Sequence, residues 1–403
     1  MSRAERGDAV RLCLAAAFSV GAALLAVMLF TGYFPGRPNE YNSYALQASA
    51  WLEGHLDILG SYPHLELALF GDRQYVSFPP FPSYVLLPFA AVWGTQTPDA
   101  AISLAVTALG AAYACRLYLR ERQDGQGLFW VLFLYLGTGY VFIAMNGYVW
   151  FLAQTMCFTL SVMSLFYARE GKGCPALTLW ACAVGCRPMT ALYLPALLYL
   201  LWGSRPAGTD LPGLIRRRWY WCVGPLVLAA SYMALNMARF GSPLEFGHTF
   251  LPEFQRAEHG QFSLAYFSDN LNKLLRMPRW QGSSEPVMFY TGNGMAFWLI
   301  DPMFFPLAAA WIMALWKRRE DLFLLIALPV LSAAYVFVLC CHRTLGGWYF
   351  GNRYLLDLMP WLFYGFCRWK PEEPRFLQAS VPFAVFGAAL NLIGSVAVYN
   401  YWI

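Results

Sequence analysis

A succession of long apolar runs, separated by short charged turns, constrains this 403-residue chain more than any other feature. The first run, 12–33, is about 22 residues long, which is enough to cross a bilayer as a helix. Further runs follow at 79–94, 98–119, 127–145, 148–168, 176–203, 219–239, 295–316, 322–341, 353–368 and 376–400. Only 13% of the residues are charged, against about 25% in soluble proteins. The sequence therefore predicts an all-α, polytopic transmembrane bundle.

The runs predict roughly 9–11 membrane segments, some of them short or re-entrant, in one membrane domain spanning 1–403. We interpret the first run as a retained signal-anchor helix, since it is too long for a signal-peptide core. Run 79–94 is short and begins with Pro79 and Pro80, so it is expected to dip into the membrane and return to the outer face. Run 176–203 is interrupted at Arg187-Pro188, which favours a hairpin of two short helices.

Basic clusters set the expected orientation, because cytoplasmic loops are enriched in Lys and Arg. The clearest clusters are Arg216–Arg218, Lys317–Arg319 and the Arg368/Lys370 pair. Placing them inside leaves two long polar loops, 34–78 and 241–294, on the non-cytoplasmic face. The first of these is expected to hold amphipathic helices that lie along the interface. Membrane lipids are expected partners, and nucleic acid is not, because the basic residues form juxtamembrane clusters and not one stripe.

The ten cysteines lie almost entirely within or beside apolar runs, and the two long outer loops contain none. This distribution predicts neither a disulfide framework nor a zinc site, and we expect no metal and no cofactor. All five histidines fall on the outer face in this layout, together with most of the acidic residues of the loops. The chemistry of the chain is therefore expected on that face.

Glu40 is the first candidate for chemistry. It is expected at or just before the start of a helix, where the helix dipole favours an ionised carboxylate that could act as a general base. A helix-capping acid without chemistry is the alternative. The same outer loop supplies three further acid–base candidates, His55, Asp57 and His64.

Arginines and aromatic residues at the membrane boundary suggest substrate contacts. Arg187 lies within an apolar run, where a charge is costly and usually marks a partner or a function. Arg73 could pair with a lipid phosphate through its planar fork, or could simply snorkel to the interface. The remaining candidates in this class are Tyr75, Arg239, His248, His342, Arg343, Trp348 and Arg353.

The segment 342–353 combines glycines with aromatic residues and arginines between two apolar runs. Glycines let a backbone approach a ligand closely, and aromatic faces beside polar groups suit a sugar ring or a lipid headgroup. A tight outer hairpin with an aromatic belt is the alternative.

These features together resemble the GT-C class of integral-membrane glycosyltransferases. They are the acid after the first helix, the Pro79-Pro80 entry, the Arg187-Pro188 break and the segments 239–247 and 346–354. Within the class the chain is most similar to bacterial relatives of protein O-mannosyltransferases and aminoarabinose transferases. The resemblance implies transfer of a sugar, with inversion, from a polyprenyl-phosphate carrier to an unknown glycan, lipid or protein acceptor. It also implies a bacterial cytoplasmic (inner) membrane location with an extracytoplasmic active face.

By the same resemblance Glu40 would be the base, and Arg187, Arg343 and Arg353 would hold the carrier phosphate. Many members of the class have Asp, or an Asp-Glu pair, where this chain has Asn39-Glu40. The chain also has no clear second acidic motif in the turn near Asn146. A transporter or flippase of a lipid-linked saccharide is the alternative function, and a non-catalytic assembly subunit is a third.

Overall fold

The computed structural model describes residues 3–205, 208, 210–280, 287–317 and 321–403. Arg318 and Arg319 of the Lys317–Arg319 cluster lie outside these residues. The described chain is mostly helical, and its strands form only two two-stranded sheets, β1–β2 and β3–β4. Six helices are long and apolar enough to cross a membrane, and four shorter apolar helices accompany them. The predicted all-α polytopic fold is confirmed.

The contacts divide the chain into two compact units that alternate along the sequence. Unit 1 contains 1–33, 107–145 and 262–403, and unit 2 contains 34–106 and 146–261. Helix α4 (Asp99–Glu121) contributes its first residues to unit 2 and the rest to unit 1. The expectation of one membrane domain stays a prediction.

Unit 1 is built from long helices. Its elements are α1 (Arg3–Phe30), α5 (Gly127–Leu136), α6 (Tyr140–Ala144), α13 (Phe267–Leu275), β3 (Arg279–Trp280), β4 (Val287–Met288), α14 (Phe297–Ile300), α15 (Phe304–Trp316), α16 (Leu322–Cys341), α17 (Met359–Trp369) and α18 (Pro374–Tyr399). The run 127–145, expected as one segment, is two helices separated at Gly137–Gly139. Asp301 occupies the break, where its carboxylate accepts a hydrogen bond from the Gly139 N–H at 2.8 Å, so a distant acid replaces the missing helical bond.

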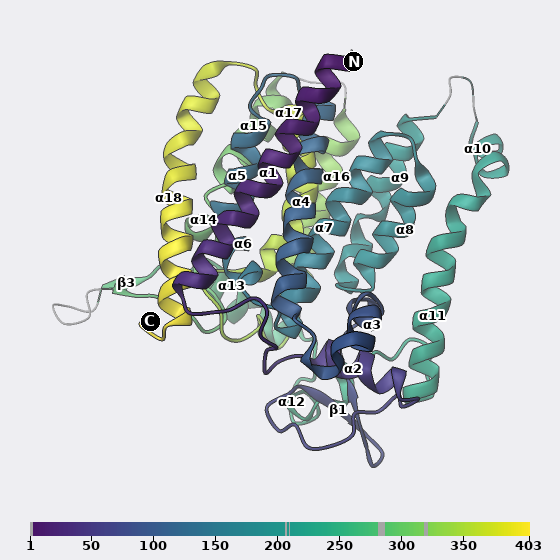
Figure 1. The fold of residues 1–403 in the computed structure, drawn as a ribbon. Helices are drawn as coiled ribbons and strands as arrows, with labels where there is room; N and C mark the ends of the chain where they lie inside the picture. Colours follow the sequence, from purple (N-terminus) through teal and green to yellow (C-terminus); the bar gives the residue numbers. More distant parts are fainter. Residues whose placement is uncertain (1–2, 206–207, 209, 281–286, 318–320) are drawn as a thin grey trace. The chain divides into compact units, whose positions relative to one another are not determined.

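Unit 2 places its loop elements at one end of its helices. Its elements are α2 (Ser43–Leu52), β1 (Leu67–Phe70), β2 (Arg73–Val76), α3 (Phe81–Trp93), α7 (Val149–Arg169), α8 (Gly173–Val184), α9 (Leu194–Gly203), α10 (Leu211–Arg218), α11 (Val223–Phe240) and α12 (Pro252–Gln255). In Figure 1, α2, α3, β1 and α12 gather at the lower end of these helices, whereas α10 lies at the upper end. Arginines fill the last turn of α10.

The hairpin expected over 176–203 is confirmed. Helix α8 ends at Val184, a 3-10 segment covers Pro188–Tyr193, and α9 returns. The two ends of the hairpin lie together, because a Cβ atom at Gly171 would be 3.4 Å from the Ser204 hydroxyl. The tip is fixed to α3 by a hydrogen bond from the Phe81 N–H to the Gly185 carbonyl (3.1 Å). Helix α3 itself has only 13 residues and is not among the helices long enough to span.

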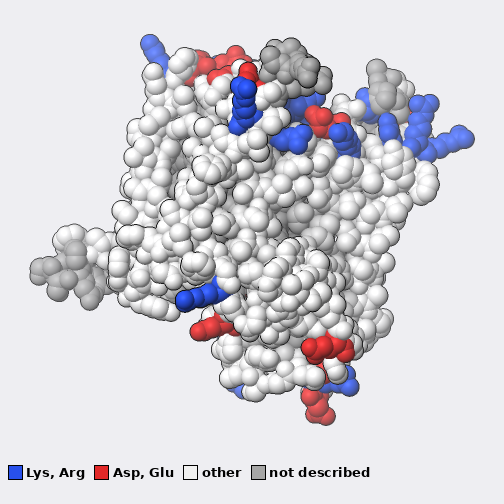
Figure 2. All heavy atoms as spheres, viewed as in Figure 1, with Lys and Arg blue, Asp and Glu red and all other residues white. Residues whose placement is uncertain are grey.

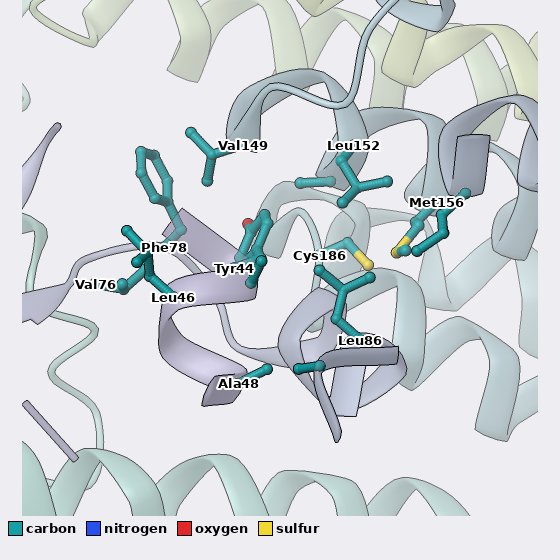
Figure 3. Packing of buried hydrophobic residues seen from close by; sticks show 14 of the residues in the cluster. Tyr44, Leu46, Ala48, Val76, Phe78, Leu86, Val149, Leu152, Met156 and Cys186 are labelled. Carbon is teal, nitrogen blue, oxygen red and sulfur yellow. The ribbon is translucent and has the colours of Figure 1, made fainter. Parts of the chain in front are cut away.

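The first outer loop differs from the expectation of surface-lying amphipathic helices. It contains one helix, α2, followed by the β1–β2 hairpin. Residues 43–49 of α2 are all buried, because both faces of the helix pack against neighbouring segments. Figure 3 shows the Tyr44 ring of α2 among Val149, Leu152 and Cys186. The segment therefore belongs to a protein core and not to an exposed surface.

In unit 1, a buried lysine joins the α4–α5 turn to the end of α17. The Lys370 side chain is 1% exposed, and its Nζ atom lies 2.9 Å from an Asp124 carboxylate oxygen and 3.1 Å from the Gln126 side-chain oxygen. Burial raises the pKa of Asp124, but the hydrogen bond from Lys370 and those from Gln126 and Tyr118 outweigh it. The net pKa of Asp124 is lowered.

Lys370→Met is expected to lower the free energy of unfolding by about 1–3 kcal/mol, because it removes a buried charged donor from the Asp124 carboxylate and from the Gln126 side-chain oxygen. Chemical unfolding of the purified chain measures this. Lys317→Met is the control, since Lys317 makes an exposed 3.7 Å ion pair with Glu373 that should contribute little. Folding lowers the pKa of Asp124. The free energy of unfolding that its ionised carboxylate contributes is therefore present above the unfolded pKa of about 3.9. It is lost as the pH falls through the lower folded pKa. Equal effects of the two substitutions would contradict this assignment.

Candidate functional site

Glu40 lies in a turn of unit 2, three residues before α2 begins. The residues beside it are fixed to other segments of the same unit. Asn39 donates from its side-chain nitrogen to an Asp99 carboxylate oxygen at 2.9 Å. The Tyr41 carbonyl accepts from the Val149 N–H at the start of α7, also at 2.9 Å. The backbone of Glu40 is thus held between α4 and α7.

Two further contacts complete this attachment. The Asn42 side chain donates to the Thr95 carbonyl at 2.8 Å, and a His64 ring nitrogen lies 3.1 Å from the Glu40 carbonyl oxygen. The Glu40 side chain itself is exposed and forms no side-chain hydrogen bond or ion pair with any described residue. A rigid backbone therefore presents a carboxylate that is open to a ligand.

Asp99 is the residue that sequence reasoning missed. It is 1% exposed, and the side chain of Asn39, itself 8% exposed, covers it. Only one of its carboxylate oxygens has a hydrogen-bond partner among the described residues. The turn near Asn146, where no acidic motif was found, packs directly on it, because a Cβ atom at Gly147 would be 2.3 Å from the Asp99 Cβ. An Asp opening the run 98–119 is a helix-start signal that could have drawn attention to it.

Asp99→Ala is expected to lower the turnover of a Glu40-dependent reaction about ten- to hundred-fold, because it frees Asn39 and lets the catalytic turn move. Asp99→Asn should retain most activity, since an amide oxygen can still accept the Asn39 hydrogen bond. The measurement is kcat against KM for both variants, and a positioning role predicts a change mainly in kcat. Equal losses in the two variants would show that the carboxylate charge itself is required.

Two of the three acid–base alternatives in the first loop, His55 and Asp57, form a separate group, whereas His64 contacts the Glu40 backbone. The Asp57 carboxylate lies 3.7 Å from an Arg73 guanidinium nitrogen and 4.0 Å from a His55 ring nitrogen. The Asp57 side chain is only 14% exposed, whereas that of Arg73 is 65% exposed. Asp57 therefore lies near the Arg73 cation and the His55 ring, in contrast to Glu40.

Arg239, His248 and Tyr75 come together around the end of β2. The Arg239 guanidinium donates to the Val76 carbonyl at 2.9 Å, and a His248 ring nitrogen lies 2.8 Å from the Ser77 carbonyl oxygen. Tyr75 is buried against the Phe240 ring. These side chains, expected from sequence to contact substrate, here hold the strand that leads into α3.

Arg187 lies at the tip of the hairpin, close to Tyr44 of α2. Burial raises the pKa of the Tyr44 hydroxyl well above its usual range, and the charge of Arg187 acts in the opposite direction. The Tyr44 hydroxyl has no hydrogen-bond partner among the described residues. Arg187 and the first loop therefore lie in the same unit, and a contact of Arg187 with substrate stays a prediction.

The other four candidates, His342, Arg343, Trp348 and Arg353, belong to unit 1. A His342 ring nitrogen lies 2.7 Å from the Thr344 carbonyl oxygen. Arg353 is 2% exposed, and its guanidinium lies 4.4 Å from the centre of the Tyr354 ring. Arg343 is half-buried, and Trp348 is 39% exposed beside an aromatic cluster. The glycines at 346, 347 and 351 have positive φ, as the backbone of this turn requires.

Metal-binding side chains do not gather anywhere in the described part of the chain, where no group of three or more His, Cys, Asp or Glu residues could hold an ion.

The chain is similar to known proteins only at the level of structure. No protein-family model matches the sequence, and no curated protein matches it. The chain is similar to the apo oligosaccharyltransferase of Archaeoglobus fulgidus, with a TM-score of 0.52 and 11% identity over 95% of this chain. It is also similar to ArnT from Cupriavidus metallidurans bound to undecaprenyl phosphate, with a TM-score of 0.51 and 15% identity over 95% of this chain.

The chain has the GT-C fold. The fold expected from the sequence resemblance is thereby confirmed, and the chain is an integral membrane protein. It spans 56% of the oligosaccharyltransferase and 74% of ArnT.

Proposed function

We propose that this chain is an inverting glycosyltransferase that moves a sugar from a polyprenyl-phosphate-linked donor to an acceptor on the non-cytoplasmic face. The observation that carries the proposal is the Glu40 turn. Its backbone is held by the Asn39–Asp99 and Tyr41–Val149 hydrogen bonds, while its carboxylate is open. A general base needs this combination, because it must be in place before the acceptor hydroxyl arrives.

The carrier would bind through its phosphate. Arg187 supplies a half-buried guanidinium at the tip of the hairpin, which can donate hydrogen bonds to phosphate oxygens. Arg343 and Arg353 stay predictions for the same role. The binding of undecaprenyl phosphate to ArnT, which shares this fold, supports a polyprenyl carrier here.

The reaction needs no group beyond the two substrates. Glu40 takes the proton from the acceptor hydroxyl, whose oxygen forms a bond to the anomeric carbon of the sugar. The bond from that carbon to the phosphate oxygen breaks, and the bonding pair leaves on polyprenyl phosphate. Attack from the side opposite the phosphate inverts the anomeric carbon, and the cation of Arg187 stabilises the charge that develops on the leaving phosphate.

The orientation follows from charge. The arginines of α10 lie at one end of unit 2, and the Glu40 loop elements gather at the other (Figure 1). The positive-inside rule assigns the α10 end to the cytoplasm, so Glu40 would face outward. The location would be a bacterial inner membrane.

The test separates transfer from transport. The purified chain is reconstituted with a polyprenyl-phosphate sugar labelled on the sugar, together with an extract of cell-envelope glycans and lipids. Release of free polyprenyl phosphate together with label in a new product is the expected result. Movement of intact labelled donor across the bilayer without bond cleavage would instead establish a flippase.

A further inference from the structure

A cavity of about 220 Å³ opens in unit 2 at the far end of α2 from Glu40. It is lined by Trp51, Gly54, His55, Leu56, Tyr84 and Leu235, which come from α2, the following turn, α3 and α11. Cavities that take drug-sized ligands measure about 300–1,000 Å³. This one is smaller and suits a single ring.

The lining joins aromatic faces to hydrogen-bonding groups. The rings of Trp51 and Tyr84 lie 5.5 Å apart at an angle of 47°. The lining residue His55 is exposed, and beyond the lining its ring lies 4.0 Å from the Asp57 carboxylate, which is 3.7 Å from Arg73. A sugar ring has apolar C–H faces that cover aromatic rings, and its hydroxyls both donate to a carboxylate and accept from Arg or His. An acyl chain could use only the rings.

The cavity also borders a surface that faces lipid. Leu235 belongs to α11, where the neighbouring side chains Met233 and Met237 are 43% and 50% exposed. Figure 2 shows no charged side chain on the visible surface over α11 below the basic group beside α10. Leu235 lies five residues before the end of the helix, which is about 7.5 Å from it. A ring in the cavity would thus lie near the depth of lipid headgroups.

The distance from Glu40 determines what such a ring could be. Eight residues of α2 separate Ser43 from Trp51, a length of about 12 Å, and Glu40 precedes Ser43. A ring beside Trp51 therefore cannot present its own hydroxyl to Glu40. Binding energy from a remote, non-reacting part of a substrate can still be used in catalysis.

From these observations we infer that the Trp51–Tyr84–His55 cavity binds a non-reacting sugar ring of a saccharide anchored in the membrane by a lipid. The apolar chains of that lipid would lie along α11. Use of this binding energy in sugar transfer rests on the proposed function, but binding of the sugar ring itself does not.

Lipid binding by the full chain in phosphatidylcholine nanodiscs tests the inference, with native mass spectrometry as the readout. The probes are monoglucosyl and monogalactosyl diacylglycerol, the same diacylglycerol without sugar, and free methyl glucoside. We expect at least ten-fold preference for a glycosylated lipid over diacylglycerol. Trp51→Ala should abolish the preference, and Trp51→Phe should retain part of it because it keeps an aromatic face. Trp93→Ala is the control, since Trp93 is a half-exposed tryptophan of the same unit outside the cavity.

Equal binding of diacylglycerol would show that the cavity takes an apolar chain, and would overturn the inference. So would binding of methyl glucoside as tight as that of the lipid, or an equal loss in Trp93→Ala. Glu40→Gln should leave lipid binding unchanged while stopping transfer. Sugar-dependent binding with no Glu40-dependent transfer would therefore contradict the proposed function alone.

Discussion

Glu40→Gln is expected to lower the transfer rate by about 10²–10⁴-fold, the usual contribution of a general base. The substitution keeps the shape of the side chain but removes its ability to take a proton. The turn should remain intact, because Asn39, Tyr41 and Asn42 anchor it through groups that the substitution does not touch. The measurement is the rate of polyprenyl phosphate release under saturating donor.

Glu53→Gln provides the matched control for that experiment. Glu53 is an exposed glutamate that caps the C-terminal end of α2, the helix that follows the Glu40 turn. Its replacement should leave the rate unchanged. Asp57→Asn tests the alternative base. Unchanged transfer in Glu40→Gln together with a large loss in Asp57→Asn would move the base to Asp57, even though Arg73 and His55 lie beside its carboxylate.

Arg187→Met is expected to weaken the binding of polyprenyl phosphate roughly ten- to hundred-fold, the effect of losing charged hydrogen bonds of about 1.5–3 kcal/mol. Arg187→Lys should lose less, because the ammonium keeps the charge but not the planar fork. Titration of polyprenyl phosphate into the chain in nanodiscs gives the dissociation constants.

Arg205→Met is the control for the binding experiment. Arg205 follows the other end of the same hairpin, where its guanidinium lies 3.6 Å from the centre of the Trp202 ring. It is not expected to contact the carrier. If both substitutions weaken binding equally, the effect is a general one of charge or hairpin stability, and Arg187 has no specific contact with the phosphate.

Arg239 and His248 have hydrogen-bond partners that the sequence could not predict. Both stand beside turn-forming residues at the end of an apolar run, and the sequence offered no way to separate a ligand contact from a structural one. In the structure they bind the carbonyls of Val76 and Ser77, which precede them by more than 160 residues. The partner of a polar side chain is a property of the fold, and a local pattern does not contain it.

Helix α2 illustrates the same limit for burial. Its sequence mixes Ser, Gln and Tyr with apolar residues, which predicted a helix lying at the membrane surface. Gln47 is fully buried and accepts a hydrogen bond from the Ser83 hydroxyl at 2.9 Å. A polar side chain can be buried when a partner satisfies it, and that partner comes from α3.

The sequence by itself determined the membrane class, most of the apolar segments and the broken hairpin at Arg187. It could do so because in lipid each helix must satisfy its own backbone hydrogen bonds, so length and apolarity can be read segment by segment. Only the tertiary structure decided what surrounds Glu40. Asp99 lies 60 residues from Asn39 along the chain, and a hydrogen bond between such residues exists only once α4 and the first loop have packed together.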